Sequence, residues 1–341
     1  MTIRRTDVGE AQGHPIERIV IGDEHAFHIV LLSIGAAIIQ CHAPGAGGYD
    51  DVILGHEDLN DALARRDYHG ATCGRFAGRI SNARFSLDGT AWPLEANEGT
   101  TSLHGGHEGF DRHNWSLVHA DEVSATFIIT SAHGDGGYPG TLEASVTYRI
   151  DGPALVIEMT ATCDRPTVVN LVNHAYWNLE GHGAGTIGDH VLNIEASRMV
   201  AATKNLLPTG ELPPVAGTPF DFRTPKPIGR DMPSVAEGGY DLCFCVDGKR
   251  GELHPMATAF APKTGRKLEV WSTEPGLQFY TAEHFDGSCI GKGGVRYGAR
   301  SGFALETQTW PDAPNRPDFP SARLDPGQTY SHVTELRFSA V

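Results

Sequence analysis

Apolar residues recur along the chain in short runs with a period of two, and turn-forming residues separate these runs. Branched and aromatic side chains dominate the runs, which is typical of β-strands. An Asp-Gly pair at residues 88–89 interrupts one run and predicts a tight hairpin. We predict strands at residues 27–34, 51–55, 84–97, 124–132, 141–150, 154–163, 190–200 and 267–273.

Helical periodicity is rare, and only residues 56–70, HEDLNDALARRDYHG, predict a short helix. The 41 glycines and 21 prolines are spread through the chain, as many tight turns require. No internal repeat, low-complexity linker or block of charge marks a domain boundary. The pattern therefore predicts one all-β domain over residues 1–341, built as a multi-stranded sandwich that is closed or nearly closed.

Composition and charge narrow the choice of partners. A chain of 341 residues can bury a sizeable core, and a formal net charge of −15 disfavours nucleic acid and anionic membranes as partners. The N-terminal stretch lacks the apolar run of a signal peptide, and the most apolar segment, residues 29–41, is too short to cross a bilayer. Six scattered cysteines without a CxxC pair or zinc spacing favour reduced thiols. We therefore expect a cytoplasmic protein.

Polar side chains break the apolar pattern at five places that are candidates for chemistry. Each has an ordinary explanation, such as a core histidine, a surface arginine or an acid in a turn. A carboxylate that ends an apolar strand is the hardest to dismiss, because burying it is costly unless it is paired or usefully protonated. The five residues are Arg79, His104, His174, Asp241 and Glu306.

Two chemistries use histidines and carboxylates on a β-sandwich. A metal site on a strand needs ligands at alternate positions, so that both side chains reach one ion. His104 and His107 are instead three residues apart, and Glu108 directly follows the second histidine. We therefore expect no metal site, and favour metal-free proton transfer between a carboxylate base and an imidazole acid.

Seven segments, in order, resemble the aldose 1-epimerase (galactose mutarotase) family, and they extend from about residue 20 to the C-terminus. The resemblance implies a large antiparallel β-sandwich of the galactose mutarotase kind, with an open sugar cleft on one face. It also implies ring opening and reclosure of a free aldose, without cofactor or metal. The segments are DVILG (51–55), GRFAGRI (74–80), LHGG (103–106), NHAYWNL (173–179), YDLCF (240–244), PGLQFYT (275–281) and ALETQTWPDAPN (304–315).

The resemblance assigns a role to each matching position. The family's general base falls on Glu306, its general acid on His174, and the histidine beside the sugar ring oxygen on His104. The chain departs from the family pattern at Gly78, where asparagine is usual, and at Trp177, where phenylalanine is commoner. The sugar-anchoring positions fall on Arg79, Asp241 and Gln278.

The properties of the two side chains support a base role for Glu306 and an acid role for His174 independently of the family resemblance. Burial raises a carboxyl pKa toward neutrality, and imidazole titrates near working pH. We therefore expect the rate to fall in acid, when Glu306 is protonated, and in base, when His174 loses its proton. The asparagines around His174 are expected to fix its orientation. Trp177 is expected either to face the sugar or to pack in the core.

Three alternatives remain open. A sugar-binding or sensor protein on the same fold would need neither Glu306 nor His174, so their presence favours an enzyme. A metal-dependent sugar isomerase is disfavoured by the histidine spacing. An epimerase acting on a sugar phosphate would need several cations, for which Arg75 and Arg84 are available, although the LHGG and ETQ segments favour a free sugar. The physiological aldose, and the choice between monomer and homodimer, stay open.

Overall fold

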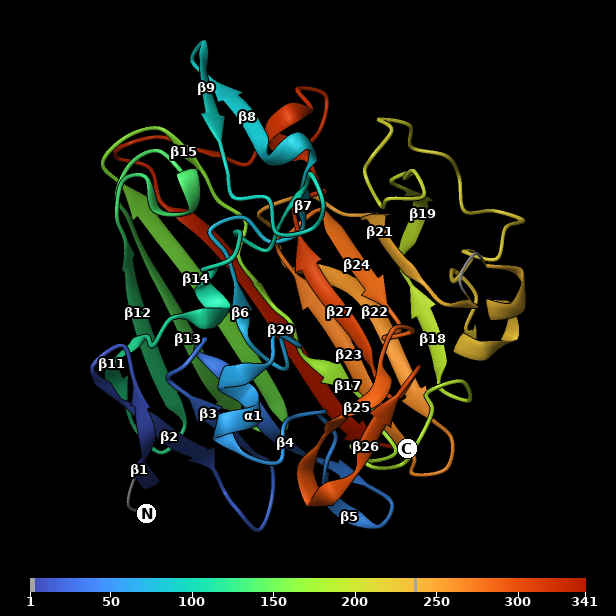
Figure 1. The fold of residues 1–341 in the computed structure, drawn as a ribbon. Coiled ribbons are helices and arrows are strands. Elements are labelled where there is room, and N and C mark those ends of the chain that lie inside the picture. The colour runs from blue at the N-terminus through green and yellow to red at the C-terminus, as the bar shows by residue number, and fades with distance from the viewer. Residues whose placement is uncertain (1–3, 236–237) are drawn as a thin grey trace.

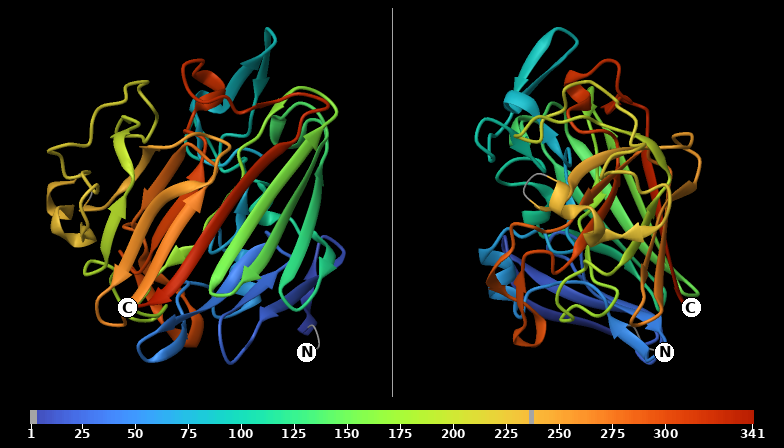
Figure 2. Two further views of the ribbon diagram at one scale, coloured as in Figure 1. Left: turned by 180° about the vertical axis from the view of Figure 1, so that it is seen from behind. Right: turned by 90° about the vertical axis from the view of Figure 1, so that its right-hand side faces the viewer.

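The structure is a computed structural model that describes residues 4–235 and 238–341. A nine-stranded antiparallel sheet forms its back, as the view from behind shows (Figure 2). Its strands, in spatial order, are β11 (Ser116–Ala120), β12 (Ser124–Ser131), β13 (Leu142–Asp151), β14 (Ala154–Cys163), β29 (Tyr330–Ala340), β23 (Arg266–Ser272), β22 (His254–Ala261), β18 (Val191–Ile194) and β20 (Lys226–Pro227).

Two five-stranded antiparallel sheets pack in front of this sheet (Figure 1). The N-terminal one contains β1 (Arg4–Ala11), β2 (His14–Gly22), β3 (His28–Leu32), β4 (Ala37–Gly45) and β5 (Gly48–Asp51). The other has the order β17 (Tyr176–Trp177), β27 (Phe303–Gln308), β24 (Gly276–Tyr280), β21 (Asp241–Val246) and β19 (Ala196–Met199). These layers confirm the predicted antiparallel β-sandwich.

Five further sheets in the described part of the chain contain only two short strands each. They are β6 (Thr72–Cys73) with β16 (Val172–Asn173), β7 (Arg79–Ile80) with β10 (Ser102–Leu103), β8 (Arg84–Leu87) with β9 (Thr90–Pro93), β15 (Thr167–Val168) with β28 (Arg323–Leu324), and β25 (Asp286–Ile290) with β26 (Arg296–Gly298). The β8–β9 pair is the hairpin predicted from Asp88-Gly89, and its register places Leu87 opposite Thr90.

The alternation of each strand explains where the core lies. Strand β23 alternates strictly between buried and half-buried residues, as expected for a strand with one covered face. Strand β27 differs, because all six of its residues are buried. Phe303 and Leu305 belong to the core cluster between the sheets, so Glu306 projects from the opposite face. Residues from both halves of the chain, among them Tyr68, Arg79 and His284, surround a cavity on that face and reduce the exposure of Glu306.

The main core cluster includes residues from Ile19 to Phe338, which supports the single domain that we propose for this chain. The predicted helix is confirmed as α1 (Leu59–Ala64), and the Asp58 side chain caps it by accepting a hydrogen bond from the Asp61 N–H. Among the described residues, no helix is long and apolar enough to span a membrane.

One strand prediction is wrong in part. Residues 51–55 form no continuous strand beyond Asp51, and Ile53 makes only an isolated bridge to Trp177. The reason is that alternate backbone N–H groups bond to different segments: Val52 donates to Cys41 and Leu54 donates to Tyr176. The stretch is therefore an apolar connection between two layers, and its composition resembles that of a buried strand.

Candidate active site

All six residues predicted for catalysis and sugar binding line one cavity of about 140 Å³. This volume lies below the roughly 300–1,000 Å³ typical of sites for drug-sized ligands, and so suits a smaller molecule. The cavity lies on the outer face of the sheet that contains β27, β24 and β21, which are marked in Figure 1. The six residues are Arg79, His104, His174, Asp241, Gln278 and Glu306.

Glu306 is held by regular sheet structure. It lies on β27, directly opposite Gln278 on β24, and it is only 3% exposed. Its Oε1 lies 3.5 Å from Nε2 of His174. A carboxylate on a central strand has little freedom to move, so the position of the proton-accepting oxygen is set by the fold.

His174 lies in a break between β16 and β17 rather than inside a strand. Its backbone N–H donates to the Ala71 carbonyl at 2.8 Å, and its carbonyl accepts from the Gly70 N–H at 3.0 Å. The neighbouring Asn173 side chain donates to the Gly70 carbonyl rather than to the imidazole. Asn173 therefore fixes the backbone that carries the His174 ring, which is an indirect form of the orienting role expected for the asparagines.

His104 owes its position to the glycines of LHGG. The backbone of His104 has a φ of 50°, and Gly105 follows with a φ of 88°. A Cβ at Gly105 would collide with the Gly74 carbonyl oxygen, so only glycine fits there. The Gly78 N–H lies 3.3 Å from Nδ1 of His104, which must accept this hydrogen bond. The ring proton is therefore on Nε2, where it can be donated to a ligand.

The three sugar-anchoring candidates form a connected polar network. The Arg79 guanidinium donates to both carboxylate oxygens of Glu98, at 2.7 and 2.9 Å, and its Nη1 lies 3.8 Å from Asp241. The Gln278 amide donates to Asp241 at 2.5 Å, which leaves its buried Oε1 without a hydrogen-bond partner in the described structure. The network thus offers both donors and acceptors, as binding hydroxyl groups requires.

Burial controls the protonation of the two central groups. It raises the pKa of Glu306 to about 8, and Asp241 adds to this rise while Arg79 opposes it. It lowers the pKa of His174 to about 4, with a smaller opposing effect from a backbone hydrogen bond. The expected direction is confirmed for Glu306. The expectation that His174 titrates near working pH is wrong, because burial penalises the imidazolium.

Aromatic side chains form the walls of the cavity. The Tyr68 ring stacks 5.5 Å from His174 and lies 4.8 Å from His104, and Tyr176 lies 4.8 Å from His174. Trp177 is instead packed in the core, 5.7 Å from Phe338. In an extended segment, alternation places residues 174 and 176 on one face and residue 177 on the other. This pattern could have identified Tyr176 from the sequence as a residue of the cavity wall.

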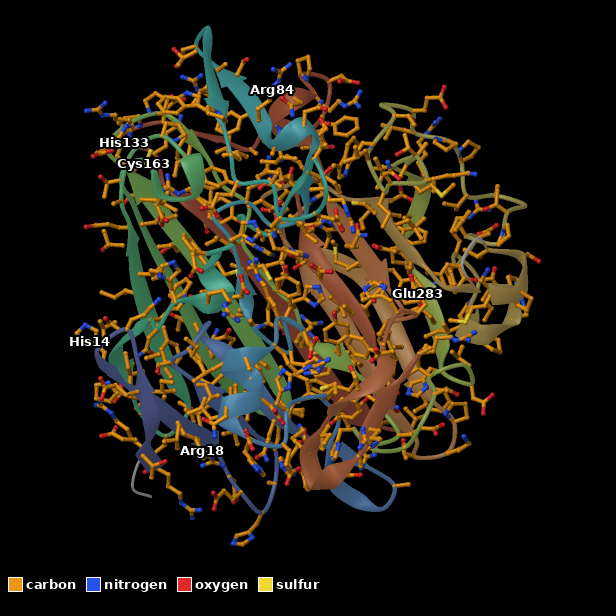
Figure 3. All side chains as sticks on the ribbon, viewed as in Figure 1. His14, Arg18, Arg84, His133, Cys163 and Glu283 are labelled. Carbon is orange, nitrogen blue, oxygen red and sulfur yellow. The ribbon has the colours of Figure 1, made fainter. Side chains whose placement is uncertain are left out.

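Three polar residues near these motifs lie outside the cavity. His107 is exposed on its glycine-rich loop. Arg75 is 2% exposed and donates to the carbonyls of Pro139 and Gly140, so it ties loops together. Arg84 is exposed on the β8–β9 hairpin, near the top of the molecule (Figure 3). Neither arginine is therefore available to a phosphate in this cavity.

The cavity also contains a possible metal-ligand set that the sequence spacing did not reveal. One ligand atom from each of His104, His174 and Glu306 lies within 4.8 Å of the others. The spacing of His104 and His107 disfavours a metal on one strand, whereas the fold brings His104 to a different histidine, His174. Metal-free chemistry therefore stays a prediction, which chelation can test.

Comparison with known proteins places the chain among sugar epimerases. Residues 17–337 match the family model described as aldose 1-epimerase. The chain is 43% identical to galactose mutarotase of Bos taurus over 294 residues, which are 86% of this chain and 85% of that protein. It is 33% identical to aldose 1-epimerase of Escherichia coli (strain K12) over 336 residues, 96% of each.

Solved structures match over nearly the whole chain. A crystal structure of an aldose epimerase homologue from C. elegans has a TM-score of 0.90 at 31% identity, and the match covers 96% of this chain and 99% of that one. Galactose 1-epimerase from Lactobacillus acidophilus has a TM-score of 0.86 at 24% identity and covers 99% of both chains, which supports the fold alone.

Proposed function

The chain belongs to the aldose 1-epimerase family and interconverts the α and β anomers of aldoses; we propose that Glu306 is its general base and His174 its general acid. The observation that carries this assignment is their geometry. A buried carboxylate and a buried imidazole face each other at 3.5 Å in the cavity that also holds the polar network. The ring opening of a hemiacetal needs one group that takes a proton and one that gives a proton.

In the proposed reaction, the Glu306 carboxylate takes the proton of the C1 hydroxyl while His174 donates its proton to the ring oxygen. The C1–O5 bond breaks, and C1 becomes a carbonyl carbon. Rotation about the C1–C2 bond then presents the other face of the carbonyl to O5. On reclosure, His174 takes the proton from O5 and Glu306 returns a proton to the C1 oxygen, so each group exchanges its role.

The shifted pKa values of Glu306 and His174 determine which protonation state of the pair is the more stable. Opening the ring converts an ionised pair into protonated Glu306 and neutral His174, which is the form that burial favours. The fold therefore stabilises the protonation state that Glu306 and His174 have when the aldose ring is open. The C1 hydroxyl of a bound ring, donating a hydrogen bond to Glu306, shifts the pair back toward the ionised form.

The remaining residues bind and orient the sugar. His104 carries its proton on Nε2 and is placed beside the ring-oxygen side in our proposal. Arg79 and Asp241 hold hydroxyl groups through charge-assisted hydrogen bonds, and the Gln278 amide offers a neutral acceptor beside them. Fixing the sugar in this way converts the proton transfers into steps within one complex. Because Arg75 and Arg84 lie outside the cavity, we propose a free monosaccharide as substrate rather than a sugar phosphate.

We also propose a cytoplasmic location. All six cysteines are unpaired, and five of them are buried. Buried, unpaired thiols are typical of proteins in reducing compartments.

Polarimetry tests the function directly. Freshly dissolved α-anomers of galactose, glucose, xylose and arabinose are followed one at a time, with and without the purified chain. We expect the approach to anomeric equilibrium to be faster with the chain for at least one aldose. A Glu306→Gln variant that is folded and binds the same sugar, yet is equally fast, would contradict the proposed base. Absence of acceleration for every aldose would contradict the activity.

A further inference from the structure

We propose that His56, His69 and Cys289 form a zinc-binding site beside the sugar cavity. One ligand atom from each of these side chains lies within 4.8 Å of the others. The site does not depend on the roles proposed for Glu306 and His174. Its two histidines lie in the wall of a second cavity, of about 500 Å³, whose described lining shares only Tyr68 with that of the sugar cavity.

Two of the donors already stand at the distance that a shared zinc ion requires. Cys289 Sγ lies 3.6 Å from Nδ1 of His56. A tetrahedral zinc ion with a Zn–S bond of about 2.3 Å and a Zn–N bond of about 2.0–2.1 Å separates the two donors by about 3.6 Å. The thiol and the imidazole therefore already stand at the spacing that one ion requires.

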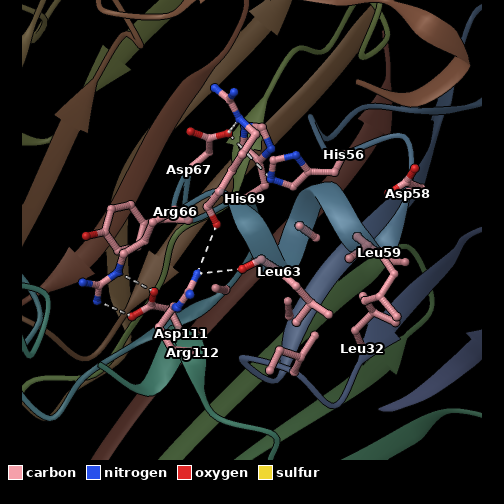
Figure 4. A pocket seen from close by; sticks show the side chains of 18 of the residues that line it. Leu32, His56, Asp58, Leu59, Leu63, Arg66, Asp67, His69, Asp111 and Arg112 are labelled. Atoms are coloured by element: carbon pink, nitrogen blue, oxygen red, sulfur yellow. Dashed lines mark hydrogen bonds and ion pairs between the residues drawn. The ribbon is translucent and has the colours of Figure 1, made fainter. Parts of the chain in front are cut away.

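His69 is buried without a hydrogen-bond partner for its ring among the described residues. It is 8% exposed, and neither of its ring nitrogens has a hydrogen-bond partner among the described residues. Its ring lies 4.7 Å from that of His56, and Figure 4 shows the two imidazoles side by side with Asp67 next to them. A buried imidazole without partners is costly, and coordination of a metal ion would satisfy one of its nitrogens.

A carboxylate lies beside His56, on the side of the ring away from the thiol. Nε2 of His56, the nitrogen that does not face the thiol, lies 3.7 Å from an Asp67 carboxylate oxygen. Histidines that bind zinc commonly donate their other ring N–H to a carboxylate, which fixes the tautomer and the ring orientation. Asp67 is thus placed to hold His56 with Nδ1 free for the ion.

Nearby cations are already paired. Arg65 donates to Asp67 at 2.7 Å, and Lys292 pairs with Asp51 and donates to the Ile53 carbonyl at 2.6 Å. Binding of Zn²⁺ would displace the thiol proton of Cys289 into solvent, which leaves two neutral imidazoles and one thiolate around the ion. Three protein ligands leave a fourth position, and His56 and His69 border the second cavity from which water can fill it.

The donors come from separate parts of the chain. His56 and His69 flank α1, and Cys289 lies on β25. A bound ion would therefore join the N-terminal and C-terminal halves next to Tyr176, whose ring lies 5.3 Å from His69 and 4.8 Å from His174.

Cobalt substitution tests the proposal with a readout that only a thiolate ligand produces. The whole chain is stripped with chelator, kept reduced with a phosphine, and titrated with Co²⁺. We expect a near-ultraviolet thiolate-to-cobalt charge-transfer band that saturates at about one ion per chain and is abolished by Zn²⁺. Calorimetry in buffers of different ionisation enthalpy should show about one proton released per zinc ion.

Variants locate the site. Cys289→Ser should lose the band, and Asp67→Asn should keep it while Zn²⁺ affinity falls about 10- to 100-fold. Cys163→Ser is the matched control and should keep it, because Cys163 lies at the far end of β14 (Figure 3). His104→Gln should also keep the band, which separates this site from the sugar cavity. Zinc binding without a charge-transfer band, a band that survives Cys289→Ser, or no binding at all would each overturn the proposal.

Discussion

Two groups of histidines both adjoin the Tyr176 ring, one through His174 and the other through His69, and they differ in the third residue that each contains. His104 and His174 face Glu306, whereas His56 and His69 face Cys289. The first group lies in a cavity with Arg79 and Asp241, which can bind hydroxyl groups. The second lies beside paired charges and the apolar residues of α1. The same kind of side chain is therefore proposed for proton transfer in the first group and for zinc binding in the second.

The groups next to each histidine, rather than the histidine itself, determine whether it is suited to proton transfer or to metal binding. Glu306 can take a proton and shares its cavity with the proposed sugar-binding residues, so an imidazole at 3.5 Å is suited to form the proposed acid–base pair. A thiol is a weak partner in that reaction but a strong ligand for zinc once deprotonated. Variants in each group should therefore affect one function and leave the other unchanged.

The largest expected effect is loss of turnover in Glu306→Gln. The amide keeps the shape of the side chain but cannot take the C1 proton, so kcat should fall by at least about 10²-fold. The rate is measured by polarimetry on a variant whose circular dichroism matches that of the wild type. Glu108→Gln, at an exposed position, is the matched control and should leave kcat unchanged. A Glu306→Gln enzyme with near-normal kcat would remove Glu306 from the base role.

Arg79→Met should have the next largest effect. Removing a charge-assisted hydrogen bond to the sugar costs about 1.5–3 kcal/mol, so kcat/KM should fall about 10- to 100-fold. Because Arg79 opposes the rise in the Glu306 pKa, the alkaline limb of kcat/KM should also move to higher pH. Arg84→Met is the control, since Arg84 is exposed on a distant hairpin. Equal kcat/KM values for the two variants would contradict a sugar-binding role for Arg79.

Sequence alone predicted more of the first group than of the second. Glu306, His174 and His104 stand in contiguous motifs, and alternation along β27 explains why Glu306 faces away from the core. Glu98 lies in an ordinary-looking polar loop, and only the tertiary fold brings it to Arg79. His56, His69 and Cys289 have no spacing typical of a metal site, because their proximity depends on long-range packing. The low pKa of His174 likewise depends on burial that no local pattern encodes.

Glu306→Gln should also change stability, by a smaller amount. The folded pKa of Glu306, about 8, lies above its usual value of 4.5, so the unfolded chain loses this proton first as the pH rises. Wild-type stability should therefore decline between about pH 4.5 and pH 8 through this group, by a few kcal/mol in total. The variant lacks this decline and should be the more stable protein at pH 8.5 in urea unfolding. A constant difference from pH 5 to pH 8.5 would contradict the raised pKa.

Chelation should have no effect on turnover. Neither step of the proposed reaction uses a metal ion, so an enzyme stripped of metal should keep its full mutarotation rate. The same treatment should abolish zinc at the Cys289 site and lower the melting temperature, since an ion bound only to the folded chain stabilises it. A rate that falls on chelation and returns with one divalent ion would instead assign the ion to His104, His174 and Glu306.

The most direct test of the acid–base pair is kcat/KM against pH for wild type and His174→Asn, with the buffer-catalysed rate subtracted. Below about pH 4 both groups of the pair are protonated, and above about pH 8 neither is, so the wild-type profile should be a bell. Its acid limb then follows His174 and its alkaline limb follows Glu306, the reverse of the order expected from sequence. In His174→Asn only Glu306 titrates, so a weak residual activity should rise through about pH 8 without an alkaline fall. If the variant keeps the wild-type alkaline limb, His174 is not the acid, and His104 is the next candidate.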